Sequence, residues 1–284
     1  MESVICTIGT ENALKDLKVF FFTLSLFNRT EKPLVFILCD TKVALEVRKM
    51  YDGPINIKIA LDKYDNLSRE QMERLPGSNY KTKWEDFMME KATVLSWAFN
   101  SGAKSAYLMD SDISFMGPLP NDPVSTKLGL SRHRIRPGDE LKYGIYNAGF
   151  LWTSDPTIPE QWLLAAKTSR YYDQAALEDL ATAQPTHEFP VQNNYGWWRM
   201  FQGVEPPITV QSFWSVFRNK DNANSGIRIY GEPVLSIHTH WDQTTSTTKL
   251  FNDFIFSKLR LLGKYEPAQI LSRFLAKEFP HLLS

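Results

Sequence analysis

Short apolar runs alternate with longer amphipathic segments along the first 110 residues of this chain. Each short run is rich in β-branched residues and is bounded by turn residues, which is typical of a buried strand. Between these runs, apolar residues recur at helical spacing. The predicted strands cover residues 3–10, 33–40, 54–61 and 104–110, and the predicted helices cover residues 11–27, 41–51 and 81–102. This order predicts an α/β fold with a mostly parallel sheet and helices on both of its faces.

The pattern becomes less regular after the fourth strand. Further strands are expected at residues 126–133 and 146–155, and further helices at 158–169 and 173–181. A loop rich in aromatic and amide side chains, HEFPVQNNYGWWRMF, precedes a last apolar strand in PVLSIHTHW. Residues 247–284 have the pattern of two amphipathic helices, which we expect to pack against the sheet.

Charge and apolar content limit the classes of partner. Because 32 Lys and Arg balance 32 Asp and Glu, no net basic field attracts nucleic acid, and no nucleic-acid partner is expected. The most apolar stretch, residues 19–27, has about half the length of a bilayer span, which predicts no transmembrane segment. The start of the sequence lacks the pattern of a signal peptide. Cys6 and Cys39 lie in apolar runs and are expected to be buried thiols, so we predict a cytoplasmic location.

Two aspartates stand one residue apart at the end of the fourth predicted strand, in AYLMDSDISFMGPLP. Neither Asp110 nor Asp112 has a basic neighbour in sequence that would relieve their repulsion. On an extended backbone, residues i and i+2 point the same way, with Cα atoms about 6.5–7 Å apart. The pair fits a hard divalent cation, which takes oxygen ligands and leaves positions open for phosphates. It does not fit a glycosidase pair, whose carboxylates flank a bond from opposite sides.

The surroundings of the pair strengthen the metal hypothesis. Ligands of α/β sheets bind beyond the carboxyl ends of the strands, where Thr7 and Asp40 also lie, so a nucleotide-sized site is expected there. His238 and His240 follow a later apolar strand, and one of them would supply a third ligand. Two alternatives stay open. In the first, the aspartates are solvated loop residues, since Asp-x-Asp also arises by chance. In the second, the histidines have structural roles.

Four motifs in order resemble one enzyme family. YLMDSDISFMGPL, YNAGFLWTSDP, YYDQAAL and IHTHW resemble, in order and spacing, the GT-A nucleotide-sugar glycosyltransferases. The chain is most similar to the retaining, glycogenin-like family 8, over roughly residues 3–242. The family motif usually continues from its late histidine to a glycine and a lysine, whereas HTHWDQTTSTTK has no glycine and Lys249 comes late. The resemblance implies a Rossmann-like central sheet with C-terminal helices.

The resemblance also implies site residues. Asp110, Asp112 and either His238 or His240 would bind Mn²⁺ or Mg²⁺, and Asp173 and Gln174 would lie at the reacting centre. The expected donor-binding residues are Thr7, Thr10, Asp40, Lys91, Ser111, Asn147, Ala148 and Gly149. Trp197 and Trp198 are a candidate acceptor platform or, equally, a buried pair. Structural alternatives exist for Asp173, as a helix N-cap, and for Asn147, as a turn residue.

The predicted function is metal-dependent transfer of a sugar from a nucleoside-diphosphate sugar to a glycan or glycoconjugate hydroxyl. UDP is preferred over GDP as carrier, and retention over inversion. We expect a single domain over 1–284, with a nucleotide-binding half (1–112), a sugar- and acceptor-binding half (113–245) and a helical tail (246–284). A non-catalytic nucleotide-sugar or glycan-binding module is the alternative. A nucleotidyl or phosphoryl transferase is disfavoured, because TIGTENALK has neither the Walker nor the Rossmann glycine spacing.

Overall fold

A mostly parallel seven-stranded sheet forms the centre of the computed structural model, which describes residues 3–123, 125–218 and 226–283. Its strand order is β3-β2-β1-β4-β7-β6-β8, and β7 runs antiparallel to both of its neighbours. The strands are β1 (Ser3–Gly9), β2 (Val35–Cys39), β3 (Ile55–Ile59), β4 (Ser105–Met109), β6 (Leu128–Arg132), β7 (Tyr146–Thr153) and β8 (Thr186–Glu188). The predicted α/β fold class and its four N-terminal strands are confirmed.

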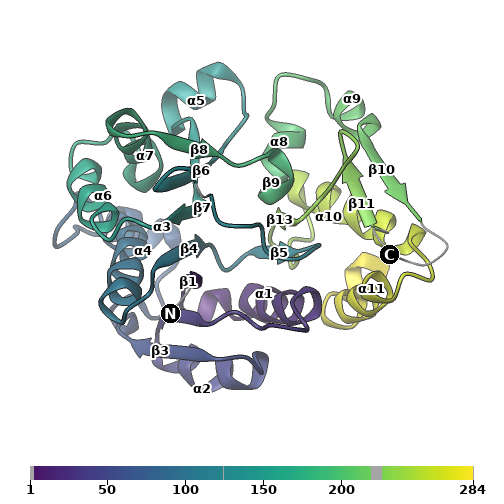
Figure 1. The fold of residues 1–284 in the computed structure, drawn as a ribbon, viewed down its shortest axis with the longest axis horizontal. Helices are drawn as coiled ribbons and strands as arrows, with labels where there is room; N and C mark the ends of the chain where they lie inside the picture. The colour runs from purple at the N-terminus through teal and green to yellow at the C-terminus, as the bar shows by residue number, and fades with distance from the viewer. Residues whose placement is uncertain (1–2, 124, 219–225, 284) are drawn as a thin grey trace.

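Helices cover both faces of this sheet (Figure 1). One face packs against α1 (Leu14–Phe27) and α2 (Thr41–Met50), and the other packs against α4 (Lys83–Asn100), α6 (Ile158–Ala166) and α7 (Tyr172–Ala183). Successive side chains of a strand point to opposite faces. Accordingly, Val4, Cys6 and Ile8 join the core beneath α4, whereas Ile5 joins the core beneath α1. The prediction that helices pack on both faces of the sheet is therefore confirmed.

The C-terminal third forms a separate apolar core. It contains α10 (Ser246–Leu261) and α11 (Glu266–Glu278) together with strands from two small sheets. These sheets are β5-β13-β9 (Ile113–Phe115, Ser236–His238, Tyr195–Gly196) and β10-β11-β12 (Trp214–Phe217, Gly226–Ile229, Glu232–Pro233). The two tail helices form as predicted, but they pack on the small sheets and on the outer side of α1. Phe22 of α1 stacks on Phe274 at 3.7 Å between ring centroids, because the outer side of α1 is also apolar.

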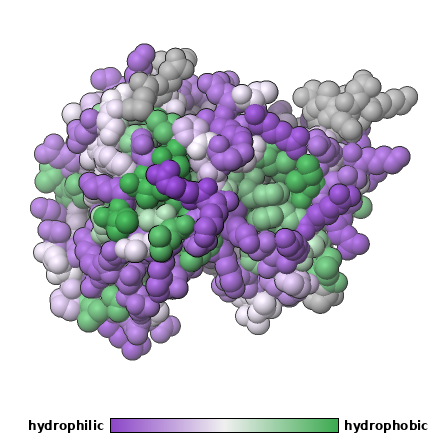
Figure 2. All heavy atoms as spheres, turned by 90° about the horizontal axis from the view of Figure 1, so that it is seen from below, coloured by the Kyte–Doolittle hydropathy of each residue, from purple (hydrophilic) through white to green (hydrophobic). Residues whose placement is uncertain are grey.

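Shorter elements complete the fold. The remaining helices are α3 (Arg69–Arg74), α5 (Pro137–Tyr143), α8 (Trp197–Phe201) and α9 (Pro207–Ser212), and the 3-10 turns are Glu11–Ala13, Asp62–Tyr64, Val191–Asn193 and Pro280–Leu283. Cys6 and Cys39 are buried free thiols, as predicted. None of the helices that the structure describes has the length and apolar content needed to cross a membrane. On the face seen in Figure 2, hydrophobic residues form separate areas within a mostly hydrophilic surface.

Strand pairing brings distant segments to one end of the sheet. β7 pairs with β4, so Gly149 accepts a hydrogen bond from the backbone of Asp110 at 2.9 Å. β5 follows β4 directly, and its Ile113 pairs with His238 of β13. The late histidine is therefore held beside Asp112 by backbone pairing, across more than a hundred residues of sequence.

Asp40 holds two segments at the end of β2. It is fully buried and is the N-cap of α2, where its Oδ1 accepts from the Val43 amide at 2.8 Å. Its Oδ2 accepts from the Glu11 amide, which follows β1, at 2.5 Å. Asp40 thus joins the start of α2 to the turn that follows β1. Both of its carboxylate oxygens are used in this structural role.

We predict that Asp40→Ala lowers the free energy of unfolding by about 1–3 kcal/mol, because it removes a helix cap and leaves a second amide unpaired. Asp40→Asn should cost less, since one side-chain oxygen still accepts a hydrogen bond. Urea denaturation of the three proteins measures both changes. Equal stabilities for wild type and Asp40→Ala would contradict this role.

Candidate metal centre and cleft

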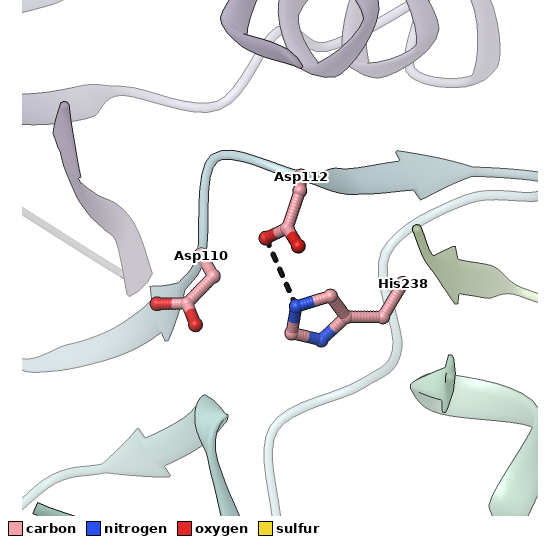
Figure 3. Close-up of side chains that lie close together, drawn as sticks. All are labelled: Asp110, Asp112 and His238. Carbon is pink, nitrogen blue, oxygen red and sulfur yellow. Dashed lines mark ion pairs between the residues drawn. The ribbon is translucent and has the colours of Figure 1, made fainter. Parts of the chain in front are cut away.

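Three side chains of the kinds that bind metal converge beyond the end of β4 (Figure 3). Asp110 and Asp112 follow this strand, and His238 ends β13. Each offers one ligand atom, and these atoms all lie within 4.8 Å of one another. The Nε2 atom of His238 is 2.9 Å from Oδ1 of Asp112. The i, i+2 spacing predicted that the two carboxylates converge, and the structure brings them together with His238.

The basic partner that the aspartates lack in sequence comes from α4. The Lys91 ammonium is 2.9 Å from Asp110, 3.1 Å from Asp173, and 3.4 Å from the carbonyl oxygen of Ala148. Burial alone would lower the pKa of Lys91, but the charges of Asp110 and Asp173 raise it above its usual range. The residue is 4 % exposed, so its charge acts at close range on both carboxylates.

The two metal-site carboxylates differ in electrostatic setting. Burial raises the pKa of Asp110, and the charge of Asp112 adds to this effect while Lys91 opposes it. For Asp112, burial favours the neutral form, but His238 and His240 together hold its pKa below the usual range. Lys91 balances one of the three carboxylates Asp110, Asp112 and Asp173. The remaining negative charge suits a divalent cation.

An amide network supports the metal centre from behind. Oδ1 of Asn194 lies 3.1 Å from Nδ1 of His238, and the amide nitrogen of Asn194 donates to Asn147 at 3.0 Å. Asn147 lies within β7 and accepts a second hydrogen bond from the Gly149 amide at 3.1 Å. Its own amide nitrogen donates to Gln174 at 3.3 Å. Asn147 is therefore a strand residue and not a turn residue. The network joins it to Gln174 directly and to His238 through Asn194.

His133 is a further member of this network that sequence reasoning did not identify. Burial lowers the pKa of His133 to about 4, so the ring is neutral near pH 7. Its Nδ1 is 2.9 Å from the Gly144 carbonyl and therefore carries the proton, which leaves Nε2 to accept from Asn147 at 3.2 Å. Neither His133 nor Asn194 belongs to a recognisable motif. Tertiary packing alone places them here.

Asp110 and Asp112 of the candidate metal centre line a cleft of about 450 Å³. The cleft has polar residues near the ends of β1 and β4, and aromatic and methionine side chains on α3 and α4. Its walls include the predicted residues Thr10, Lys91, Asp110, Ser111, Asp112, Asp173, Gln174 and His240. They also include residues that sequence reasoning missed, namely Asn12, Asp16, Arg69, Met72, Trp84, Phe87, Met88, Tyr171 and Tyr172. One face of α4 carries four of the wall residues, Trp84, Phe87, Met88 and Lys91. Their helical spacing in the sequence could have indicated this shared face.

Other predicted residues lie outside the cleft walls. Thr7 is buried within β1, and Asp40 is buried as the cap of α2. Trp198 packs edge-on against His238 at 4.8 Å between ring centroids, and Trp197 packs against the C-terminal core. Trp198 therefore packs against the side of His238, and neither tryptophan lines the cleft.

The two histidines have separate surroundings. His240 is half-exposed at the cleft wall, with Nδ1 2.8 Å from Asp16 and Nε2 3.4 Å from Asp112. The charge of Asp112, together with Asp16, raises the pKa of His240 to about 10, so it is protonated and pairs with Asp16. His238 is buried, and it is the histidine grouped with both aspartates.

The start of α7 places Asp173 and Gln174 in the cleft. The N-cap of α7 is Tyr171, so Asp173 is not the cap of this helix. Tyr172 has a φ of +36°, a left-handed conformation that is strained for a bulky residue. Trp162 donates to the carbonyl oxygen of Asp173 at 2.8 Å, and the carboxylate of Asp173 faces Lys91.

Gly149 leaves the space in which a cation fits. A Cβ atom at this position would lie 2.5 Å from Cε1 of His238 and 2.6 Å from Oδ2 of Asp110. Backbone and ligands therefore approach more closely than a side chain allows. Two carboxylates and an imidazole nitrogen form a donor set suited to Mn²⁺, and the carboxylates suit Mg²⁺. The residues present thus fit a divalent cation.

Comparison with known proteins identifies the fold. No protein-family model matches the sequence, and no curated protein matches it significantly. Three glycosyltransferase structures do resemble this one. Mouse xyloside xylosyltransferase 1 is 12% identical, with a TM-score of 0.51 over 84% of this chain and 98% of that one. The galactosyltransferase LgtC, determined with donor and acceptor sugar analogs, is 13% identical, with a TM-score of 0.55 over 96% of both chains.

The third structure is the glycosyltransferase GlyE of Streptococcus pneumoniae TIGR4. It is 14% identical, with a TM-score of 0.55 over 98% of this chain, which spans only 64% of the GlyE chain. At such low identity these similarities establish the fold. The chain has the GT-A fold of nucleotide-sugar glycosyltransferases, as the sequence motifs predicted.

We predict that Gly149→Ala weakens Mn²⁺ binding at least about tenfold, because the new methyl group displaces His238 and Asp110. Isothermal titration with MnCl₂ measures the affinity. Gly129→Ala is the matched control. Gly129 lies in β6, the strand next to β7, and its Cβ would lie 2.7 Å from the Phe189 ring, away from the three ligands. Similar Mn²⁺ affinities in both variants would contradict the assigned cation position.

Proposed function

We propose that this chain is a metal-dependent glycosyltransferase that moves a sugar from a UDP-sugar to a hydroxyl group of a glycan or glycoconjugate. The observation that carries the proposal is the convergence of Asp110, Asp112 and His238 beside a 450 Å³ cleft. The cleft also reaches the carboxyl end of β1, the position at which α/β sheets bind nucleotides.

Asp110, Asp112 and His238 would hold Mn²⁺ or Mg²⁺. When bound, the cation acts as a Lewis acid that neutralises the charge of the departing diphosphate. His238 presents Nε2 to this site because Asn194 binds the opposite nitrogen, which fixes the ring orientation. Lys91 lies 2.9 Å from Asp110, and its charge opposes the rise in the pKa of Asp110 that burial causes, which favours the ionised form that binds a metal.

The polar wall of the cleft is suited to a sugar. Asp173 and Gln174 present carboxylate and amide groups beside the metal centre, and Asn147 fixes the side chain of Gln174. Toward β1, Thr10 and Asn12 offer hydrogen-bonding groups for a nucleoside, and Asn12 also donates to the Leu67 carbonyl at 3.1 Å. Donor residues therefore follow one another from β1 to α7 along a single cleft.

The surroundings of Asp173 support retention over inversion. An inverting enzyme requires a carboxylate base that accepts a proton from the acceptor hydroxyl. Asp173 is buried and lies 3.1 Å from the Lys91 ammonium, so its carboxylate is already engaged in an ion pair. The negative charge of the Asp173 carboxylate, held in a fixed position, is suited to stabilising an oxocarbenium-like state at the sugar. Asp173 therefore acts by electrostatic stabilisation in our proposal.

We predict that UDP raises the melting temperature only when Mn²⁺ is present, because the diphosphate requires the cation. Saturation to about 100 times Kd adds about 2.7 kcal/mol, which is about 4–5 °C for a chain of this size. Asp110→Asn and Asp112→Asn should abolish the Mn²⁺-dependent shift. Asp52→Asn, whose partners are Ser25 and Lys32, is a control outside the cleft. Shifts that persist in both cleft variants would refute the metal assignment.

We predict that Asp173→Asn lowers transfer by about two to four orders of magnitude while Mn²⁺-dependent UDP binding is kept. The substitution retains the side-chain shape and removes the charge. Turnover is measured as UDP release from the UDP-sugar that the wild type uses best. Asp179→Asn, an exposed position on the same helix, controls for general effects on α7. Transfer within a few-fold of wild type would remove Asp173 from the mechanism, and donor binding without any turnover by the wild type would indicate a binding module.

A further inference from the structure

A second cavity lies directly beside the cleft. It has a volume of about 590 Å³ and is formed by the segment that leads into α4, the end of α6 and the turn that enters α7. Tyr171 and Tyr172 belong to the walls of both cavities. The other wall residues of the second cavity are Asn79, Tyr80, Lys81, Thr82, Glu85, Ala166, Lys167, Ser169 and Arg170. A molecule that crosses the tyrosine pair would therefore contact both cavities.

The tyrosine pair is fixed next to the reacting centre. Tyr171 and Tyr172 immediately precede Asp173, so they lie about 4–7 Å from it along the backbone. Their ring centroids are 4.5 Å apart, and Tyr143 packs edge-on against Tyr171 at 4.9 Å. The left-handed backbone of Tyr172 costs conformational energy, yet the surrounding contacts hold it. Both rings are half-buried, which leaves aromatic surface available to a ligand.

The cleft side of the pair continues as an aromatic wall. Trp84 lies at the start of α4, and the Arg69 guanidinium is 5.0 Å from the centre of its ring. Aromatic side chains bury apolar area while they keep a polar handle, and their faces accept the C–H groups of sugar rings. From the reacting centre outward, a ligand thus meets Asp173, then the tyrosines, with Trp84 at one side.

The second cavity carries free positive charge. Among the residues that the structure describes, the ammonium groups of Lys81 and Lys167 have no ion-pair partner. Arg170 is neutralised by Glu178, whose carboxylate it contacts through two nitrogens at 2.7 Å. The one acidic wall residue, Glu85, accepts a hydrogen bond from the Lys81 backbone at 3.0 Å. Two unpaired lysines against one glutamate leave a small net positive charge on these walls, which favours an anionic ligand.

We propose that the second cavity is a distal acceptor subsite for an acidic oligosaccharide. The inference rests on the proposed glycosyltransferase function. The reacting unit of the acceptor occupies the cleft beside Asp173, the next unit crosses Tyr171 and Tyr172, and a unit that bears a carboxylate or phosphate lies near Lys81 and Lys167. The acceptor class is thus a saccharide of at least two units, recognised by aromatic contact and by charge.

Binding of defined saccharides tests this subsite. The full chain, with UDP and Mn²⁺, is applied to an array of neutral, uronic-acid-containing and phosphate-containing oligosaccharides. The strongest ligand is then titrated calorimetrically. We expect the strongest ligand to be acidic, and we expect the Lys81→Gln, Lys167→Gln double variant to bind it at least tenfold more weakly. Tyr172→Asn should weaken it similarly, because asparagine tolerates the left-handed backbone but lacks the ring.

The control is Lys104→Gln, an exposed lysine beyond the opposite end of α4, which should bind like the wild type. The lysine variants and the control should keep the Mn²⁺-dependent shift with UDP, because neither Lys81 nor Lys167 lines the cleft. Absence of that shift in the wild type would overturn the proposed function itself. The subsite is refuted if that shift is present but no oligosaccharide binds, if neutral chains bind as well as acidic ones, or if the lysine and tyrosine changes leave the affinity unchanged.

Discussion

The candidate site depends on the buried ion pairs that the Lys91 ammonium makes with Asp110 and Asp173. The ammonium lies between Asp110, which follows β4, and Asp173, which is in the first turn of α7. Removing one partner from a buried charge group typically costs about 3–5 kcal/mol, because the other charges remain unpaired. Lys91 therefore joins the candidate metal centre to Asp173. It also explains how acidic residues that would repel each other coexist in one cleft.

A second constraint comes from the small sheet around β13. His238 is placed by backbone pairing with β5, and its ring is oriented by Asn194. Because Asn194 also binds Asn147, a displacement at the metal ligand is transmitted to the side chain that holds Gln174. The candidate metal centre and Gln174 in the cleft wall are thus joined by one hydrogen-bond network.

The fold was predictable to the extent that it rests on local pattern. The first four strands and their helices follow from apolar periodicity, and the convergence of Asp110 and Asp112 follows from their spacing. The roles of Asn194 and His133 depend on contacts between segments that are distant in sequence, so no local pattern could indicate them. The sequence also allowed Asp173 to be the N-cap of α7, but the helix begins earlier, with Tyr171 as its N-cap. The tail helices were predicted, but their packing on α1 was not, because both sides of that helix are apolar.

The central claim is that a divalent cation bound by Asp110, Asp112 and His238 holds the diphosphate of the donor. Anomalous X-ray diffraction from crystals grown with MnCl₂ and UDP tests it most directly, because manganese is located independently of the protein atoms. We expect one strong anomalous peak bounded by these three side chains and adjacent to the diphosphate. Well-defined UDP in the cleft with no manganese at this position, or with manganese bound elsewhere, would contradict it.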